Sequence, residues 1–461
     1  MTTLIIISVL PIVLLYLGLY KAQKALLPVA IIGLLAALVA AVMQWTEKNE
    51  AVIIYNGMML FNNFSIAFSV ISIVSTILIL LLSKGYFERI SSHIAEYYAI
   101  ILFALAGIIV MVSYHNLVML FIGIEIMSVS LYILAGIRKN DFASNEAALK
   151  YFLMGAFSTG FLLFGITLIY GASGSFDLEA IRNYVAANPH NIDPIFYTGI
   201  LLIIVGLCFK VGAAPFHFWT PDVYEGAPSL ITLFMSTVVK VAGFAAFLRL
   251  FSACFILMAD FWSPVLLVIT IITLFIGNIT ALYQQSFKRM LAFSSISHAG
   301  YLLFAIVAVG AGSANSIFVY STAYSIASIV AFGALILVRQ QTGTDNFDGF
   351  NGLAKKNPFL AFVLTVSMLS LAGIPLTAGF IGKFYMFSEA LSQYKIWLVI
   401  IAVVNAIISI FYYFRVIIAM YFRSDDRVEV EVPAYYKFVL GFSALATIII
   451  GVYPAFISGL I

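Results

Sequence analysis

The amino-acid sequence predicts an all-α polytopic membrane protein with about fourteen transmembrane helices. Of its 461 residues, 63% are hydrophobic and only 9% are charged, and the mean hydropathy is +1.10. Soluble globular domains carry about one-quarter charged residues, so this composition lies far outside their range. The apolar residues occur in runs of about twenty, the length that an α-helix needs to cross about 30 Å of hydrocarbon. No soluble domain is expected.

The predicted spans follow one another along the chain with short connections. We place them at about 2–20, 25–45, 64–83, 96–113, 116–137, 146–170, 195–216, 228–250, 261–283, 290–310, 315–338, 358–388, 396–420 and 436–457. The first run has neither a basic residue ahead of it nor a small-residue cleavage site. We therefore expect a retained span rather than a secretory signal. The connection from Gly171 to Pro194 is expected to form a short helix on the outer surface.

Basic residues at the ends of the spans predict the orientation of the chain. Thirteen of them follow odd-numbered spans, namely Lys21, Lys24, Lys84, Arg89, Arg138, Lys139, Lys288, Arg289, Arg339, Lys355, Lys356, Arg423 and Arg427. Four follow even-numbered spans, namely Lys48, Arg182, Arg249 and Lys395. Because cytoplasmic loops are enriched in Lys and Arg, this bias predicts that both termini lie on the periplasmic side.

The six remaining basic residues fall inside predicted spans, at Lys150, Lys210, Lys240, Lys383, Arg415 and Lys437. Arg415 and Lys437 lie near the cytoplasmic ends of their spans, where a long side chain can snorkel to the headgroups. For Lys150, one to two turns into its span, snorkelling and a functional role both remain open. Lys240 follows Pro228 by about twelve residues, or ~18 Å of helix, which is too deep for snorkelling.

Two predicted spans are interrupted by glycine and proline close to a lysine. Lys210 precedes the sequence Gly212-Ala213-Ala214-Pro215, and Lys383 follows the sequence Gly373-Ile374-Pro375. These are the seventh and the twelfth predicted spans. Because consecutive spans alternate in direction and the two are five apart, they cross the membrane in opposite directions. Paired broken helices are typical of inverted-repeat transporters, whose ion sites lie near the midplane, although Gly and Pro can also simply kink packed helices. We expect an N-terminal three-helix segment (1–95), two inverted five-helix repeats (96–250 and 259–422) with discontinuous helices 7 and 12, and a C-terminal helix (434–461).

Glu125 is the main acidic residue inside a predicted span. An isolated carboxylate near the membrane midplane is protonated or paired, and Lys210 is its first candidate partner. His298 lies about two turns into its span among serine hydroxyls, where it is either a proton relay or a satisfied packing residue. A buried lysine resists charging, and a nearby carboxylate favours the charge, so these side chains suit proton translocation. They do not supply the energy for it.

The sequence contains no pattern for a cofactor or a metal. Cys208 and Cys254 lie in separate apolar segments without paired spacing, so disulfide, zinc and iron–sulfur sites all lack ligands. No Gly-rich phosphate loop is present. We therefore expect any nucleotide or redox chemistry to take place in another chain.

Several of these motifs, taken in order, resemble the antiporter-like family. That family comprises the membrane-arm subunits of respiratory complex I and subunits of multisubunit sodium/proton antiporters. The motifs are Glu125 within Leu120-Phe121-Ile122-Gly123-Ile124-Glu125, Lys150 within Ala148-Leu149-Lys150-Tyr151-Phe152, the stretch from Lys210 to Trp219, and the stretch from Lys288 to His298. The likeness runs from about Tyr97 to Arg423. It is specific as an ordered set, whereas each fragment alone is weak.

The resemblance implies a function and a role for each residue. The chain would translocate protons as a membrane-arm subunit of NADH-quinone oxidoreductase in the bacterial inner membrane. Glu125 and Lys210 would form the ion pair that gates charging, and Lys150 would influence this pair. Lys240 would be the central proton carrier and Lys383 the distal one, with His298 connecting them.

The resemblance also implies partners and a subunit type. Quinone reduction in other subunits would drive the transport, and NADH, FMN, iron–sulfur clusters and quinone would bind there. Subunits K and M would be the neighbours. Lys383 stands where one subunit type and its antiporter relative usually carry glutamate, and the chain stops soon after the fourteenth span, where a longer type continues with a lateral helix. We therefore expect a shorter type of membrane-arm subunit.

Two other classes of protein remain open. One is a subunit of a cation/proton antiporter that exchanges sodium for protons without redox input. A sodium site usually needs clustered oxygen ligands, whereas the predicted midplane offers lysines and one glutamate, which favours protons. The other is a structural scaffold with inert ion pairs, which four internal lysines disfavour.

Overall fold

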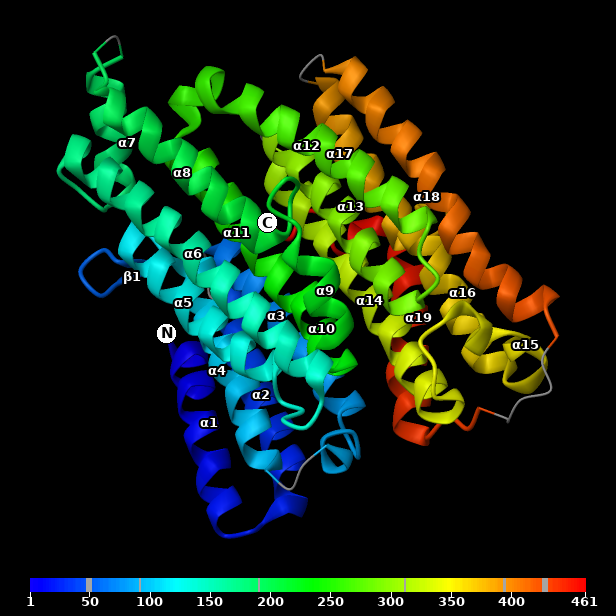
Figure 1. Ribbon diagram of the computed structural model, residues 1–461. Helices are drawn as coiled ribbons and strands as arrows, with labels where there is room; N and C mark the ends of the chain where they lie inside the picture. Colours follow the sequence, from blue (N-terminus) through cyan, green and yellow to red (C-terminus); the bar gives the residue numbers. More distant parts are fainter. Residues whose placement is uncertain (47–51, 91–92, 190, 311, 393–394, 425–429) are drawn as a thin grey trace.

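The computed structural model describes residues 1–46, 52–90, 93–189, 191–310, 312–392, 395–424 and 430–461, and most of these are helical (Figure 1). Within these ranges, 13 helices are long and apolar enough to cross a membrane. The all-α membrane fold expected from the composition is therefore confirmed. Lys48, His190 and Arg427 lie outside the described residues.

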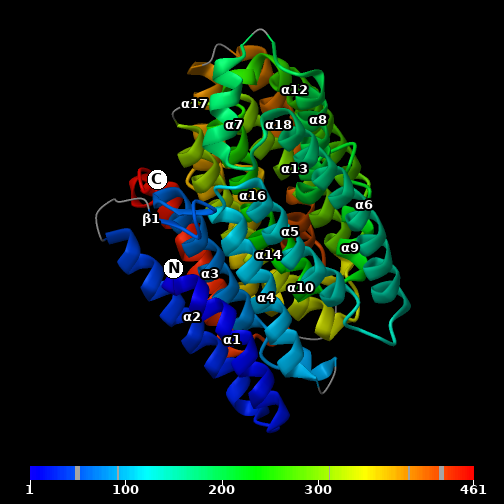
Figure 2. The ribbon, with the colours of Figure 1, turned by 90° about the vertical axis from the view of Figure 1, so that its left-hand side faces the viewer.

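The N-terminal segment packs along one edge of the bundle (Figure 2). It consists of α1 (Thr2–Leu19), α2 (Gln23–Thr46), the antiparallel hairpin β1 (Val52–Ile54) and β2 (Met59–Phe61), and α3 (Asn63–Leu82). The Asn62 side chain accepts a hydrogen bond from the Ser65 amide and fixes the start of α3. Next come η1 (Phe87–Arg89), α4 (Ile94–Ser113), α5 (Leu117–Ala135), α6 (Phe142–Ser173) and α7 (Leu178–Ala187). The short helix expected between Gly171 and Pro194 is α7.

The central and C-terminal parts contain the broken helices. The central elements are α8 (Pro194–Val211), α9 (Trp219–Gly226), α10 (Ser229–Phe234), the π-helical turn η2 (Met235–Val239), α11 (Lys240–Arg249), a second π-helical turn η3 (Leu250–Cys254), η4 (Ile256–Met258), α12 (Ala259–Leu282), α13 (Phe287–Val307) and α14 (Ser313–Thr342). The C-terminal elements are η5 (Phe347–Phe350), α15 (Leu353–Lys356), α16 (Pro358–Ala372), α17 (Ala378–Ser392), α18 (Ile396–Phe422), α19 (Ala434–Val452) and η6 (Pro454–Phe456).

The predicted breaks in spans seven and twelve are present and share one geometry. In α8, the Gly212 amide donates to the Phe209 carbonyl and the Ala213 amide to the Cys208 carbonyl. In α16, the Gly373 amide donates to the Ser370 carbonyl and the Ile374 amide to the Leu369 carbonyl. Both patterns are Schellman caps, which need a residue with positive φ after the helix, and Gly212 and Gly373 have φ values of +73° and +84°.

The breaks also change two predicted boundaries. Span seven extends beyond residue 216, because the chain resumes as α9 after the break and ends at Gly226. The predicted span 358–388 is divided between α16 and α17, which have 15 residues each. At 1.5 Å per residue neither half reaches across about 30 Å of hydrocarbon alone. Among the described residues, the predicted crossing at 358–388 is therefore the one that is absent from the 13 apolar helices long enough to span a membrane.

The centre of the bundle is formed by the segment from Ser229 to Cys254 and by α13, whose most apolar windows are completely buried. By contrast, α1, α2 and α18 bury only about one-third of theirs (28–33%) and lie on the outside. The two central segments carry Lys240 and His298. These polar side chains are therefore enclosed by protein on every side, and the surrounding helices must satisfy them.

Candidate functional site

Lys240 lies at the centre of the bundle, immediately after the π-helical turn η2. Its side chain is 4% exposed, and Nζ donates to the carbonyl oxygen and to Oγ of Ser295 on α13, each at 2.5 Å. π-helical turns within α-helices often occur at functional sites, since the wider turn changes where the next side chains point. Among the described residues no carboxylate forms a salt bridge with Lys240, so neutral oxygens alone solvate its amine.

His298, one turn further along α13, connects three helices through hydroxyl groups. Its Nε2 lies 2.9 Å from the Tyr413 hydroxyl on α18, and its Nδ1 lies 2.5 Å from the Tyr320 hydroxyl on α14. The Tyr413 hydroxyl is also 2.5 Å from Oγ of Ser294, the neighbour of the residue that binds Lys240. All of these side chains are buried. They form an imidazole and hydroxyl cluster that begins beside Lys240 and can pass a proton between neighbouring groups.

Lys383 lies on α17 and reaches back across the break to the end of α16. Its Nζ donates to the carbonyl oxygens of Ala372 at 2.9 Å and Leu371 at 3.3 Å. These carbonyls belong to the last turn of α16, where the helix dipole places partial negative charge. The ammonium also lies 4.7 Å from the centre of the Tyr301 ring, and Tyr301 follows His298 by three residues on α13. The broken helix thus provides a binding place for a cation without a carboxylate.

Lys210 is the last lysine before the first break, and it points toward α5. Its Nζ donates to Oγ of Ser128 at 2.9 Å and to the Tyr132 hydroxyl at 3.4 Å. Glu125 lies one turn before Ser128 on α5, and its buried Oε1 has no hydrogen-bond partner among the described residues. No salt bridge joins Glu125 to Lys210 in the part of the chain described. Lys210 of α8 therefore contacts the helix that carries Glu125, α5. The direct pairing of Lys210 with Glu125 remains a prediction.

Lys150 belongs to a more exposed group of charges. Its side chain is 41% exposed, and Nζ lies 2.8 Å from Oε1 of Glu146 and 2.8 Å from Oδ2 of Asp222 on α9. Arg289 on α13 lies 3.3 Å from Oδ1 of Asp222 and also pairs with Glu225. These charges line a cavity of about 310 Å³. Lys150 is therefore joined by alternating charges to the break region and to α13, rather than isolated inside the membrane.

One basic residue that was counted at a span end is buried. Lys288 was counted among the charges at a cytoplasmic span end, but it is 0% exposed. Its Nζ donates to the carbonyl oxygens of Glu225 at 2.8 Å and Ala227 at 2.6 Å, and so closes the end of α9. The discontinuous helix ends next to the start of α13, so this lysine is buried although it lies at a span end.

Sequence reasoning also missed several partners of the predicted residues. Ser295 was visible as one of the hydroxyls around His298, but Tyr413, Tyr320 and Ser128 carried no local signal. Each of them lies on a different helix from the residue that it contacts. Within the described ranges, no three His, Cys, Asp or Glu side chains are grouped so that they could hold a metal ion.

Broken helices whose ends face buried ionisable groups define a class of polytopic helical membrane proteins, to which secondary transporters belong. The family profile described as NADH:quinone oxidoreductase/Mrp antiporter, transmembrane, matches residues 113–409. The chain belongs to this family, as its motifs predicted.

Individual relatives agree with the family assignment. NADH-quinone oxidoreductase subunit N of Cytophaga hutchinsonii is 41% identical over 457 residues, which cover 98% of each chain. A chain of respiratory complex I from Thermus thermophilus with bound aureothin superposes with a TM-score of 0.84 at 31% identity, over 98% of this chain and 97% of that chain. A chain of the Mrp complex from Dietzia sp. DQ12-45-1b superposes with a TM-score of 0.88 at 20% identity, over 99% and 95% of the two chains, which shows a shared fold.

Proposed function

We propose that this chain translocates protons as a membrane-arm subunit of a bacterial NADH-quinone oxidoreductase, of the subunit N type. One observation carries the proposal: Lys240, the His298 cluster and Lys383 occupy one buried band across the centre of the bundle. Relatives at about 40% identity over nearly the whole chain support the assignment to this complex. Lys383 supports the subunit N type, because the family resemblance associates a glutamate at this position with other types of membrane-arm subunit.

The buried groups divide the translocation into steps. Lys240 accepts a proton in the centre, where Ser295 oxygens stabilise the ammonium. The His298 imidazole and the Tyr413 and Tyr320 hydroxyls pass the proton toward Lys383, the distal carrier, whose ammonium rests on the end of α16. An ammonium at one lysine disfavours a second nearby, because like charges repel strongly where water is scarce. Protons therefore move singly along the band.

Lys210 and Glu125 control the charging of Lys240 in this proposal. When Lys210 leaves Ser128 and pairs with Glu125, its positive charge is neutralised, and Lys240 can take up a proton. When the pair opens, the charge on Lys210 favours release from Lys240. Lys150 acts on this gate through Asp222 and the end of α9. Quinone reduction in other subunits, which bind NADH, FMN, iron–sulfur clusters and quinone, supplies the energy.

The same proposal includes the topology and the partners. Residues 96–250 and 259–422 form two inverted repeats, each with one broken helix, flanked by the segments 1–95 and 434–461. The two identical helix caps before the breaks support this division. Both termini lie on the periplasmic side of the inner membrane, since the basic span ends favour the opposite face as cytoplasmic. Subunits K and M are the proposed neighbours.

A cation/proton antiporter subunit is the second candidate. The fold shared with the Mrp complex favours it, but that likeness extends to the fold alone. The amines of Lys240 and Lys383 contact oxygens as donors, whereas a sodium ion needs oxygens that are free to coordinate it. Proton transport through the lysines therefore accounts better for the geometry.

The test uses membranes from a host whose assembled complex carries Lys240→Ala or Lys210→Ala in this subunit. Quinone-dependent NADH oxidation and the accompanying proton gradient are recorded together, after assembly has been verified. The matched control is Lys437→Ala, which removes an exposed lysine of α19. We expect both activities to fall together in the two variants and to persist in the control. Unchanged NADH oxidation with loss of sodium/proton exchange would instead establish the antiporter function.

A further inference from the structure

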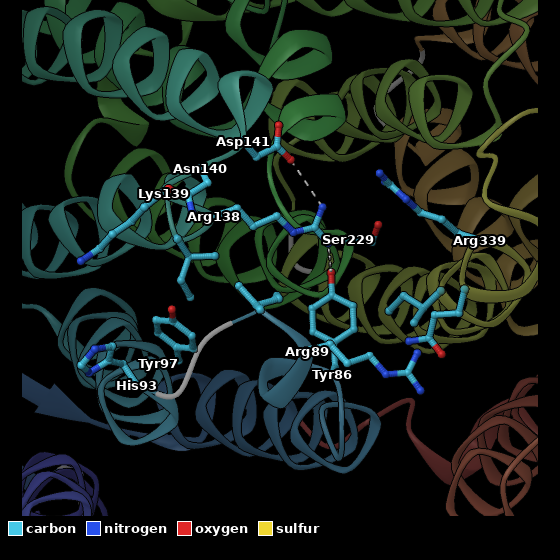
Figure 3. Close-up of a pocket in the computed structure, with 14 residues that line it drawn as sticks. Tyr86, Arg89, His93, Tyr97, Arg138, Lys139, Asn140, Asp141, Ser229 and Arg339 are labelled. Carbon is cyan, nitrogen blue, oxygen red and sulfur yellow. Dashed lines mark hydrogen bonds and ion pairs between the residues drawn. The ribbon is translucent and has the colours of Figure 1, made fainter.

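A second polar site lies at the end of the bundle where the basic residues gather, apart from the lysine band. It is a cavity of about 650 Å³ between the α3–α4 connection, the α5–α6 connection, the start of α10 and the end of α14 (Figure 3). Its charged lining consists of Arg89, His93, Arg138, Lys139 and Arg339, with Asp141 as its acidic residue. The residues come from segments far apart in the sequence, so the fold itself assembles this cluster.

Carboxylates contact only part of this cluster, and one of these contacts joins Nδ1 of His93 to Oε1 of Glu96 at 3.2 Å. Oδ2 of Asp141 lies 3.7 Å from Nη1 of Arg138, a loose ion pair (Figure 3). Arg339 pairs at 2.7 Å with Asp345, which is not part of the cavity lining. Arg89 and Lys139 form no salt bridge with any described residue, and both are exposed residues that line the cavity. At least two unneutralised cations therefore face one space, which favours an anion.

The position of the cavity favours a phosphate group that belongs to a lipid. A second cavity of about 560 Å³ shares His93 with the first, and its lining combines Leu15, Leu19 and Leu26 of α1 and α2 with the charged side chains of Lys21 and Glu96. These helices lie at the edge of the bundle (Figure 2) and expose most of their apolar side chains. The leucines of this cavity, next to the basic cavity, match a phospholipid, whose acyl chains and headgroup need different surroundings. Basic pockets between membrane helices on the cytoplasmic side bind such headgroups.

Tyr86 and Tyr97 strengthen this match. Both tyrosines line the basic cavity, and aromatic side chains with a polar tip are enriched at the level of the lipid headgroups. Nη2 of Arg138 lies 3.5 Å from the Tyr86 hydroxyl. Arginine binds phosphate oxygens through two parallel N–H groups, and the weak contacts of Arg138 leave its guanidinium able to do so.

We propose that this cavity binds the phosphate headgroup of an anionic phospholipid of the cytoplasmic leaflet. Arg89, Arg138 and Lys139 hold the phosphate, and the leucines of the second cavity hold an acyl chain. The cavity also includes Ser229, the first residue of α10, from which the chain continues to Lys240. The bound headgroup thus contacts both the α3–α4 and the α5–α6 connection next to the start of α10. This binding does not depend on proton translocation.

The test is photo-crosslinking on the purified, assembled complex in lipid nanodiscs. One set of nanodiscs contains phosphatidylglycerol with a photoactivatable group near its headgroup, and a matched set contains photoactivatable phosphatidylcholine. Peptide mass spectrometry then measures crosslinks to residues 86–90 and 137–141. We expect phosphatidylglycerol to exceed phosphatidylcholine several-fold, and Arg89→Gln or Lys139→Gln to lower the crosslinking by about fivefold each. Lys355→Gln removes an exposed lysine counted on the same face and outside the cavity, and it should leave the crosslinking unchanged.

Other results would overturn the proposal. Equal labelling by the two lipids would mean that the cavity does not select a negative headgroup. Loss of phosphatidylglycerol labelling in millimolar inorganic phosphate would identify a site for soluble phosphate instead. Crosslinks from neither lipid in the assembled complex would mean that another occupant, such as an acidic side chain of a neighbouring subunit, fills the cavity.

Discussion

Lys383 and Ala372 meet across the break between α17 and α16, with Nζ of the lysine 2.9 Å from the carbonyl oxygen. The contact places the ammonium of Lys383 at the carboxyl end of the half-helix α16. Gly373 makes this contact possible. A Cβ added at Gly373 would lie 2.8 Å from Cδ and 3.1 Å from Nζ of Lys383. The glycine therefore serves two purposes, because it permits a φ of +84° and leaves room for the lysine.

Gly373→Ala should impair proton translocation through this contact. Displacing the ammonium from its carbonyls removes charge-assisted hydrogen bonds worth about 1.5–3 kcal/mol, which corresponds to at least about tenfold in rate. The measurement is the proton gradient formed per NADH oxidised. Gly343→Ala is the matched control, because Gly343 also has a positive φ of +74° but has no neighbour within 4 Å of the added Cβ. Equal loss in both variants would attribute the effect to backbone strain alone.

Tyr413→Phe should slow transfer between Lys240 and Lys383. The substitution removes the hydroxyl that contacts Nε2 of His298 and Oγ of Ser294 and leaves the ring in place. One buried hydrogen bond contributes about 1 kcal/mol, so we expect proton translocation to fall by about fivefold. Assembly should be normal. Tyr412→Phe controls for loss of a buried hydroxyl, since the Tyr412 hydroxyl donates to Asn278 instead. If the two variants behave alike, Tyr413 is not part of the transfer route.

The sequence predicted the features that depend on local chemistry. Glycine and proline inside apolar runs correctly located both breaks, because only an interruption of the helix suits these residues there. The distance of Lys240 from Pro228 predicted a side chain too deep for snorkelling, and the side chain is 4% exposed. In both cases the relevant information lies within about twelve residues of the feature.

Features that depend on contacts between distant helices were not predictable from the same patterns. Tyr413 is 115 residues away from His298, and apolar helices pack in many registers, so no spacing links the two. The π-helical turn before Lys240 has no characteristic amino-acid pattern by which it could be recognised in the sequence. The burial of Lys288 at its span end was also not predictable, because the end of α9 that its amine caps is created by the tertiary fold.

Ser128→Ala should alter the gate at Lys210. The hydroxyl of Ser128 accepts from Lys210 at 2.9 Å, and its loss leaves the ammonium with the longer contact to Tyr132. We expect Lys210 to shift toward Glu125, which lowers coupled proton translocation while the complex still assembles. Ser130→Ala is the control, because Ser130 lies on the same helix and also donates to a carbonyl four residues earlier, without a lysine contact. Infrared difference spectroscopy of the carboxyl region should show a change at Glu125 in Ser128→Ala, and an unchanged spectrum would contradict this role for Ser128.

Asp222→Asn should separate Lys150 from Arg289, because Asp222 is the carboxylate that contacts both. Glu146→Gln is the control, since Glu146 contacts Lys150 from the same helix and does not bridge to α9 or α13. We expect Asp222→Asn to reduce NADH-driven proton translocation more than Glu146→Gln does, with the larger difference at low ionic strength. Screening shortens the range of exposed charges from about 30 Å at 0.01 M salt to about 8 Å at 0.15 M. The measurement is the translocation rate of both variants across this range of salt. If the two rates differ equally at every salt concentration, Asp222 acts through packing rather than through its charge.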